Sequence, residues 1–224
     1  GLLDRFVRDV AGAPAVLIGN SMGGMVSLLA ADAQPDSVAG LVLIDPSLPV
    51  PRQLPDPQIA SQFLVYAVPF FGERYMALRQ GRMSDRQLVQ RVVNLCFADP
   101  SRASGQLMQA ATALAGCRRS MPAQEAAFLQ AARSLMWVLS RPQRYLALMN
   151  RIDVPVLLVH GDRDRLVPVA AARSTLAANP RWDGAILAGS GHTPQLESPD
   201  AVIDNVMQWL DRHGLAQQPA DSKR

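Results

Sequence analysis

The chain has 224 residues, of which 49% are hydrophobic and 18% charged, and its formal net charge is +3. This length and balance indicate one large globular domain, or a core with an insertion, and exclude a disordered chain. The cationic residues are scattered arginines with one lysine, Lys223, so no basic stripe suggests a nucleic-acid partner.

No apolar run reaches the roughly 20 residues that cross a membrane. The two cysteines, Cys96 and Cys117, lack metal-ligand spacing, so free thiols in a reducing compartment are expected. With no signal-like start, these features favour a cytoplasmic protein. Nothing in the sequence indicates the oligomeric state.

The first elements predicted along the chain are a helix, a strand and a second helix. Apolar residues at helical spacing predict a helix over residues 1–12, with Gly12 as its stop. The apolar run 15–19 predicts a strand, and residues 22–33 predict the next helix.

Between that strand and that helix lies a Gly-x-Ser-x-Gly turn, formed by Gly19, Asn20, Ser21, Met22 and Gly23. A strand that ends in such a turn and leaves as a helix projects one serine above the edge of a sheet. Side chains in place of Gly19 and Gly23 are expected to collide with the folded backbone. Ser21 is therefore the candidate nucleophile.

The unbroken apolar run 38–44 predicts a second strand, parallel to the first and buried on both faces. Prolines then interrupt regular structure, at Pro46, Pro49, Pro51, Pro55 and Pro57. Periodicity up to residue 150 is helical, which predicts an all-helical insertion. The predicted helices are Gln58–Tyr66, Phe71–Arg79, Asp85–Phe97, Pro100–Ala115, Ala123–Val138 and Pro142–Arg151.

After the insertion, a strand, a helix, a short strand and a closing helix are predicted over residues 154–160, 169–178, 184–187 and 199–213. The closing helix has an apolar face of Val202, Val206, Trp209 and Leu210. The sequence thus predicts an α/β protein with a mostly parallel sheet. Its expected parts are a core of residues 1–46 and 151–214, a helical cap of residues 47–150, and a disordered polar tail, 215–224.

A serine becomes a strong nucleophile when a base takes its proton and a third group orients that base. Among the three histidines, His192 lies in a glycine-rich loop after the last predicted strand, where the sites of parallel sheets form. His192 is therefore the candidate base. His160 ends a strand and is interpreted as structural, and His213 ends a surface helix and is interpreted as solvated.

The orienting acid is expected after the strand 154–160. Asp164, three residues past Gly161, is the first choice. Asp162 is interpreted as a turn residue that bonds its own backbone. Asp45, directly after the strand 38–44, is a third candidate; its alternative interpretation is a loop-entry residue before proline.

Three motifs together resemble the α/β-hydrolase superfamily, in its lidded esterase-like branch. They are Gly19-Asn20-Ser21-Met22-Gly23-Gly24, Gly161-x-x-Asp164-x-x-Val167-Pro168 and Gly191-His192-x-Pro194-x-x-Glu197-x-Pro199. The resemblance covers residues 1 to about 213. It implies the fold of that superfamily with a helical cap, and no metal or cofactor.

The resemblance also implies the roles of single residues. Ser21 is the nucleophile, His192 the general base and acid, and Asp164 the carboxylate that orients it. The main-chain N–H of Met22 is one donor to the oxyanion. Glu197 is expected to be a structural hydrogen-bond partner at a helix start.

Members of this superfamily have several strands before the Gly-x-Ser-x-Gly turn, and a His-Gly type loop that supplies a second oxyanion donor. Here one predicted helix and one predicted strand precede Ser21. We therefore expect an N-terminally truncated hydrolase whose strand 15–19 lacks sheet neighbours. Because losing one oxyanion donor costs roughly 10²–10³ in rate, weak or no turnover is expected of this chain alone.

The helical insertion is expected to form an apolar roof over Ser21, which favours an uncharged, fairly apolar small-molecule ester as substrate. The candidate roof residues are Phe63, Tyr66, Phe70, Phe71, Met76, Met108, Met136 and Trp137. A lid that touches lipid is an alternative.

The leading hypothesis is hydrolysis of a carboxylic ester through an acyl-enzyme. One rival is hydrolytic C–C cleavage of vinylogous diketones, because the resemblance to those enzymes includes the string Gly-Asn-Ser-Met-Gly-Gly. Their histidine is usually followed by an aromatic residue, whereas Thr193 follows His192 here. Dehalogenases and epoxide hydrolases have an aspartate at the position that Ser21 occupies here, which disfavours them. A rival of another class is a non-catalytic binding scaffold.

Overall fold

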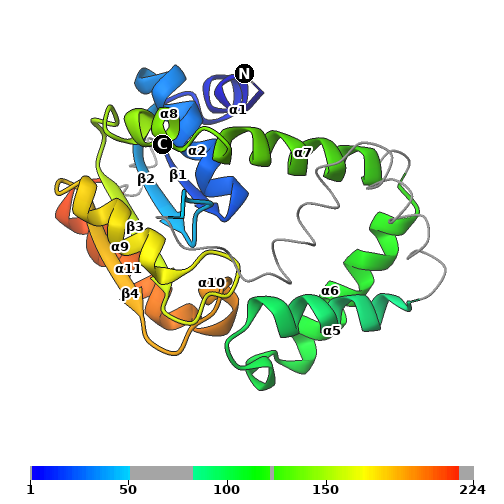
Figure 1. Ribbon diagram of the computed structural model, residues 1–224. Coiled ribbons are helices and arrows are strands. Elements are labelled where there is room, and N and C mark those ends of the chain that lie inside the picture. The colour runs from blue at the N-terminus through cyan, green and yellow to red at the C-terminus, as the bar shows by residue number, and fades with distance from the viewer. Residues whose placement is uncertain (1, 51–82, 122–123, 217–224) are drawn as a thin grey trace, which may run out of the picture.

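The computed structural model describes residues 2–50, 83–121 and 124–216, and in them helices pack on both faces of a parallel sheet (Figure 1). The strands are β1 (Ala15–Asn20), β2 (Val38–Ile44), β3 (Val156–Gly161) and β4 (Asp183–Leu187). The helices are α1 (Leu2–Phe6), α2 (Met22–Ala33), α5 (Asp85–Cys96), α6 (Gly105–Arg119), α7 (Gln124–Leu139), α8 (Pro142–Met149), α9 (Val169–Ala178), α10 (Pro194–Glu197) and α11 (Pro199–Arg212). Short helical turns are η1 (Val7–Ala11), η2 (Pro35–Ser37) and η3 (Pro100–Arg102).

The four described strands lie in the order β1-β2-β3-β4, and each neighbouring pair is parallel. Leu41 of β2 is paired with Leu17 on one side and with Val156 on the other. Because all these strands point the same way, their carboxyl ends meet at one edge of the sheet. The loops that carry the candidate nucleophile and acid both begin at that edge.

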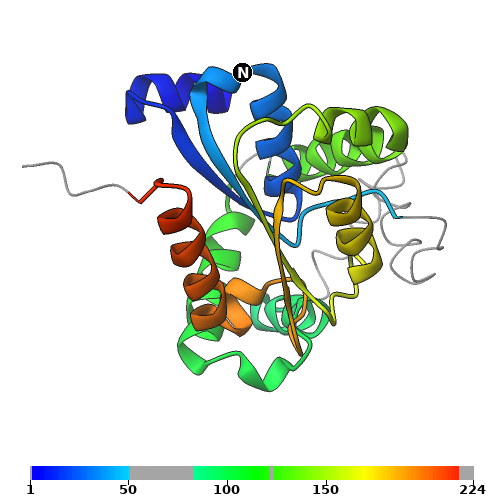
Figure 2. The same cartoon turned by 90° about the vertical axis from the view of Figure 1, so that its left-hand side faces the viewer.

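Helices lie on both sides of the sheet (Figure 2), and alternate residues of β2 belong to two different cores. Leu41 and Leu43 belong to a core shared with α2, α8 and α9. Val42 and Ile44 belong to a second core, closed by Val202 and Trp209 of α11. Burial on both faces explains why β2 is an unbroken apolar run.

Strand β1 is an edge strand among the described strands, since it is paired there with β2 alone. Its side chain Ile18 is 59% exposed, in contrast to the buried side chains of β2. As an edge strand, β1 has backbone groups on one side that no described strand pairs.

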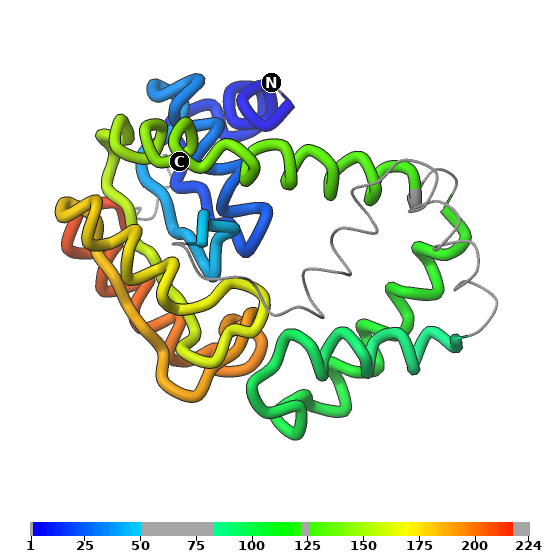
Figure 3. The backbone as a smooth tube through the Cα atoms, in the orientation of Figure 1, coloured from blue at the N-terminus to red at the C-terminus, as the bar shows by residue number. Residues whose placement is uncertain are grey.

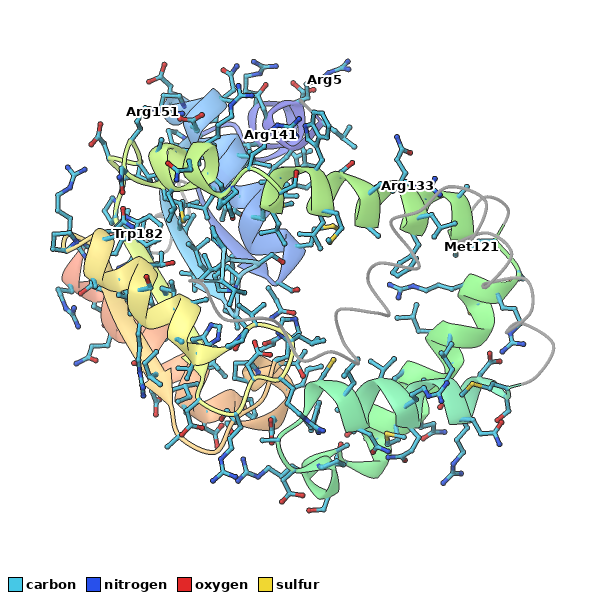
Figure 4. All side chains as sticks on the ribbon, viewed as in Figure 1. Arg5, Met121, Arg133, Arg141, Arg151 and Trp182 are labelled. Atoms are coloured by element: carbon cyan, nitrogen blue, oxygen red, sulfur yellow. The ribbon has the colours of Figure 1, made fainter. Side chains whose placement is uncertain are left out.

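Helices α5–α8 lie between β2 and β3 in the sequence and extend beside the sheet (Figures 1 and 3). Val89, Val93 and Phe97 of the α5 region form a small core against α6. Helix α7 leads back to α8, whose Tyr145 and Met149 are buried in the core shared with α2. In Figure 4, Met121 and Arg133 lie at the outer end of this insertion, and Trp182 lies beside the sheet.

Most predicted elements agree with the structure to within two residues. The helices 22–33 and 169–178 and the strand 38–44 are confirmed residue for residue. The single helix predicted over Pro100–Ala115 is wrong, because the chain forms η3 and then starts α6 anew. Ser104 causes this break: its hydroxyl accepts the N–H of Leu107 at 3.1 Å, which caps the start of α6. The predicted helices Gln58–Tyr66 and Phe71–Arg79 lie outside the described residues.

The ends of the described chain hold two further findings. The first helix ends at Gly12, whose φ is 67°, as predicted. Of its apolar residues, Val7 is buried but Phe6 and Val10 are exposed. The disordered tail was expected to start at Leu215, and this is wrong for that residue. Leu215 packs against the α11-side core and donates its N–H to Leu210 at 2.8 Å.

Candidate active site

Ser21 occupies a strained turn between β1 and α2. Its φ is 53° and its ψ is −118°, a conformation that side chains rarely adopt outside functional turns. The Ser21 N–H donates to the carbonyl of Ile44 at 3.0 Å, and its own carbonyl accepts the N–H of Ser47 at 3.0 Å. The end of β2 therefore holds the turn in place.

The glycines around Ser21 differ from the prediction in one respect. A Cβ at Gly19 would lie 2.5 Å from the carbonyl carbon of Gly23, so a side chain is excluded there as expected. A Cβ at Gly23 would meet no described atom within 4 Å, so the collision predicted for Gly23 is wrong. The second crowded position is Gly24, where a Cβ would lie 2.8 Å from Cβ of Pro46. A Cβ at position 23 would point away from the serine turn, because this residue already belongs to the first turn of α2.

His192 and Asp164 are brought together by the loops that follow β4 and β3. Nδ1 of His192 lies 2.7 Å from Oδ2 of Asp164, and both residues are buried. A carboxylate only accepts, so Nδ1 donates and Nε2 is left to act as a base. The other oxygen of Asp164 accepts the N–H groups of Leu166 at 2.7 Å and Val167 at 3.0 Å.

The environment of Asp164 favours its charged form. Burial acts to raise the pKa of Asp164, but the hydrogen bond and charge of His192 outweigh it, with help from the N–H of Val167. The pKa of Asp164 therefore lies below its usual value, and the carboxylate stays ionised beside His192.

The turn that carries Ser21 is tied to the loop that carries His192 by a residue that sequence reasoning passed over. Nδ2 of Asn20 donates to the carbonyl of His192 at 3.0 Å and to that of Ile44 at 3.0 Å. Asn20 directly precedes Ser21, so these bonds place the serine turn against the histidine loop. A polar side chain at the end of an apolar strand, directly before the candidate nucleophile, was the signal that could have found it.

Asp162 is placed apart from that pair. Its Oδ1 accepts the N–H of Gly189 at 2.7 Å, which links the loop after β3 to the loop after β4. The prediction that Asp162 bonds its own backbone is wrong, because the partner lies in a different loop. No described hydrogen bond joins Asp162 to His192, whereas Asp164 makes one.

Asp45 lies at the start of the loop after β2, as its alternative interpretation has it, but its side chain is fully buried. Its φ is 41°, and its Oδ1 accepts the N–H of Gly161 at 2.9 Å. Burial, and next the charge of Asp164, raise the pKa of Asp45 to about 9. Asp45 is therefore a neutral acid at neutral pH, and it lies beside the carboxylate of Asp164 rather than in its place.

His160 is structural, as interpreted from the sequence. Its side chain is fully buried, and Nε2 donates to the carbonyl of Val167 at 2.9 Å. Burial lowers the pKa of His160 by more than the nearby charge of Asp164 raises it, so the ring is neutral. Within the described residues, Asp45, His160 and Asp164 offer ligand atoms within 4.8 Å of one another, a spacing that could hold a metal ion. Asp164 is already bonded to His192.

His213 is exposed, as its position at the end of the surface helix α11 predicted. Its Nε2 lies 2.8 Å from Oδ2 of Asp183, and its ring centroid lies 5.3 Å from that of Trp209. The prediction of a solvated histidine is confirmed, and Asp183 on the neighbouring β4 is an additional hydrogen-bond partner.

Met22 is the first residue of α2, so its N–H has no acceptor within the helix. The positive end of the α2 dipole strengthens the electrostatic attraction of this N–H for an anion.

Of the candidate roof residues, Met108 and Met136 are half-buried and Trp137 is 64% exposed. The guanidinium of Arg141, which Figure 4 labels, is stacked on the ring of Trp137. Phe63, Tyr66, Phe70, Phe71 and Met76 lie outside the described residues.

Both cysteines are free thiols, as predicted. Burial and the charge of Asp164 raise the pKa of Cys96 to about 11, so it is not a reactive thiolate. Across the described residues, no helix combines the length and the hydropathy needed to cross a bilayer.

Known proteins were compared with this chain. A family profile described as "Alpha/beta hydrolase family" matches residues 1–205. The monoglyceride lipase of Rattus norvegicus is 26% identical over 216 residues, which cover 93% of this chain and 62% of the lipase. The pimeloyl-[acyl-carrier protein] methyl ester esterase of Xanthomonas oryzae pv. oryzae is 30% identical over 210 residues, 93% of this chain and 76% of the esterase.

Among solved structures, 2-hydroxy-6-oxo-6-phenylhexa-2,4-dienoate hydrolase from a Rhodococcus species matches with a TM-score of 0.64 and 20% identity, over 91% of this chain and 66% of that one. This likeness concerns the fold. The chain spans 62% of the length of the rat lipase. Strand β1 of the parallel sheet leads into a serine turn of the expected kind, and the family profile covers nearly all of the described residues. The α/β-hydrolase fold is therefore confirmed, and the chain belongs to the alpha/beta hydrolase family.

Proposed function

We propose that this chain carries the catalytic centre of a serine hydrolase, which cleaves the carboxylic ester of a fairly apolar small molecule through an acyl-enzyme. The observation that carries the proposal is the 2.7 Å bond between His192 and Asp164, in a loop bonded to the serine turn. The printed names of the two relatives, a monoglyceride lipase and a methyl ester esterase, support ester hydrolysis.

In the first step, Nε2 of His192 takes the proton of Ser21 while the serine oxygen attacks the ester carbonyl carbon. Asp164 accepts from Nδ1 and stabilises the imidazolium that forms. The N–H of Met22 donates to the oxygen on which negative charge develops. The tetrahedral intermediate collapses when the alcohol leaves with the proton from His192.

In the second step, His192 takes a proton from water, and the resulting hydroxide attacks the acyl carbon on Ser21. Collapse of the second intermediate returns the proton to Ser21 and releases the carboxylic acid. Asp164 and His192 are buried and Ser21 is half-buried, which strengthens these charge interactions relative to bulk water.

Labelling with a fluorophosphonate probe tests the proposal, since a serine activated by a base attacks the phosphorus of the probe, displaces fluoride and becomes a stable phosphonate ester. Labelling needs a single attack by Ser21 and no turnover, so even a chain with weak turnover is expected to gain one adduct, located on Ser21 by peptide mass spectrometry. Ser21→Ala abolishes the adduct, and His192→Ala slows labelling about 10³-fold or more.

The matched controls are Ser120→Ala, which alters an exposed serine at the end of α6, and His213→Ala, which alters the histidine paired with Asp183. Both are expected to label at the unmodified rate. A folded unmodified chain that leaves Ser21 unlabelled would overturn the proposal and favour a non-catalytic scaffold.

Cleavage of C–C bonds is the second candidate, favoured by the Gly-Asn-Ser-Met-Gly-Gly string. The two reactions differ in the bond that breaks, so the rates on a p-nitrophenyl ester and on a vinylogous diketone separate them. We expect the ester to react faster. If the diketone instead releases its acid fragment faster than the ester reacts, the proposed reaction is C–C cleavage and not ester hydrolysis.

A further inference from the structure

Glu197 has a fully buried side chain that accepts three main-chain N–H groups. Oε2 accepts from Gly191 at 2.7 Å and from Ala98 at 3.1 Å, and Oε1 accepts from Asp99 at 2.8 Å. Gly191 belongs to the histidine loop, while Ala98 and Asp99 belong to the helical insertion. Glu197 is the structural hydrogen-bond partner that the sequence predicts, although it ends α10 rather than starting a helix. Its carboxylate joins the histidine loop to Ala98, which lies 99 positions before Glu197 in the chain.

The same two segments touch directly beside Glu197. The N–H of His192 donates to the carbonyl of Cys96 at 2.6 Å. A Cβ at Gly191 would overlap the carbonyl oxygen of Cys96 and the nitrogen of Ala98, so only glycine allows this approach. The backbone on the N-terminal side of the His192 Cα is therefore set by contacts with the insertion, while the carbonyl on its other side accepts from Asn20.

Two arginines add further links across the same boundary. Nη1 of Arg102 donates to the carbonyl of Gly189 at 3.1 Å and lies 3.6 Å from Oε1 of Glu197. Nη2 of Arg165, which follows Asp164, donates to the carbonyl of Asn94 at 2.6 Å. We use the name histidine clamp for Glu197, Arg102 and the main chain of residues 96–99.

We propose that Glu197 is a positioning residue: through the histidine clamp it makes the α5 end of the helical insertion part of the support that aims the His192 imidazole at Ser21. The inference rests on the proposed function for what His192 does, and on the contacts above for how it is held. The α5 end of the insertion is then a fixed support for the histidine loop. A substitution within it is expected to alter the position of His192 without contacting the substrate.

The chemistry of the carboxylate explains why glutamate is needed. All three partners of Glu197 are donors, and an ionised carboxylate offers acceptors on both oxygens. In Glu197→Gln one oxygen becomes an NH₂ group that faces an N–H, so at least one bond is lost while the size of the side chain is kept. The buried charge is compensated by the three N–H groups and by Arg102.

A purely structural glutamate and a positioning glutamate predict different results for a folded variant. The first lowers the melting temperature and leaves the site unchanged. The second also loosens the bond from Nδ1 of His192 to Asp164. That proton can be followed by NMR in histidine-labelled protein, because the chain has three histidines.

The test compares Glu197→Gln with the full unmodified chain. We expect the Nδ1 proton of His192 to exchange faster with water, and fluorophosphonate labelling of Ser21 to slow about 10–100-fold, since small misplacements of a catalytic group have effects of this order. The matched control is Asp32→Asn, a carboxylate bonded to Arg151 at 2.8 Å away from the clamp, which should change neither readout. Unchanged proton exchange and labelling in folded Glu197→Gln would overturn the inference.

Arg102→Ala is the second variant and decides the question alone if Glu197→Gln does not fold. Arg102 is half-exposed, so its removal is tolerated, and it deletes the bond to Gly189 while leaving the three N–H bonds of Glu197. We expect the same two changes at smaller size, and no change in either would overturn the clamp. If Ser21 is unlabelled in every protein, the proposed function fails, while the exchange of the His192 proton still decides the positioning role.

Discussion

Asn20 and His192, which are 172 positions apart in the sequence, are joined by a 3.0 Å hydrogen bond from the side-chain amide of Asn20 to the main-chain carbonyl of His192. The second N–H of the same amide donates to the carbonyl of Ile44 at 3.0 Å. One side chain thus fastens the serine turn to the end of β2 and to the loop that carries the candidate base.

Asn20→Ala is expected to destabilise the fold by about 1–3 kcal/mol, because two partly buried carbonyls lose their donor. Labelling of Ser21 should slow as well, since the histidine loop is then free to move from the serine turn. Unfolding in urea measures the first effect and fluorophosphonate labelling the second.

Asn205→Ala is the control for this prediction. The amide of Asn205 donates to Ala201 at 2.7 Å within α11, so its loss is local to a helix. We expect normal labelling of this variant. Equal labelling rates in Asn20→Ala and Asn205→Ala would contradict the role assigned to Asn20.

Gly19→Ala and Gly23→Ala are expected to differ sharply although both alter the same motif. The methyl group at position 19 would overlap the backbone of Gly23, which costs at least about 3 kcal/mol and distorts the serine turn. At position 23 no described atom is near, and alanine favours a helix over glycine by roughly 0.5–1 kcal/mol. Thermal unfolding of both variants checks this, and a larger loss at position 23 would refute it.

Tyr145→Phe tests the link between α8 and the loop after β2. The buried hydroxyl of Tyr145 donates to the carbonyl of Ser47 at 3.1 Å, and the N–H of Ser47 donates to Ser21. Deleting the hydroxyl should cost about 1 kcal/mol, or a fall of roughly 2–4 °C in melting temperature. Labelling of Ser21 should stay unchanged, because the Ser47 N–H bond remains. A slowed reaction with unaltered stability would instead place Tyr145 in the support of the serine.

The sequence predicted the layout of the fold because its signals are local. The apolar run 38–44 reflects burial on both faces of β2, and the glycine pattern around Ser21 reflects a tight turn. The order of Ser21, Asp164 and His192 along the chain indicated which loops to compare. The apolar run and the glycine pattern each lie within a few neighbouring residues, whereas the order of the three site residues came from the resemblance to a known family.

The contacts that support the site were beyond the reach of such signals. Asn20 with His192, Glu197 with Ala98, and Asp45 with Gly161 are pairs about a hundred or more positions apart. Periodicity records which side of an element is buried and carries no information on its distant partner. The break between η3 and α6 has a different, local cause: one cap, Ser104, interrupts an otherwise helical pattern.

Asp45 offers a prediction in which stability depends on pH. Burial and the charge of Asp164 raise the pKa of Asp45 from 3.8 to about 9 in the folded protein, while in the unfolded chain the group ionises near the lower value. Between these values the unfolded chain gives up a proton that the folded protein keeps. The folded state is therefore progressively disfavoured by Asp45 as the pH rises from about 4 to about 9.

Asp45→Asn removes this dependence, because an amide does not ionise and its oxygen can still accept the N–H of Gly161. We expect the variant and the unmodified chain to be similarly stable near pH 4, and the variant to gain a growing advantage toward pH 9. Asp164, whose pKa is lowered, loses its contribution only at acid pH and does so in both proteins. Urea unfolding at about pH 5, 7 and 9 measures the difference. A difference that stays constant over this range would mean that Asp45 is ionised when folded, and would return it to consideration as an acid that serves His192.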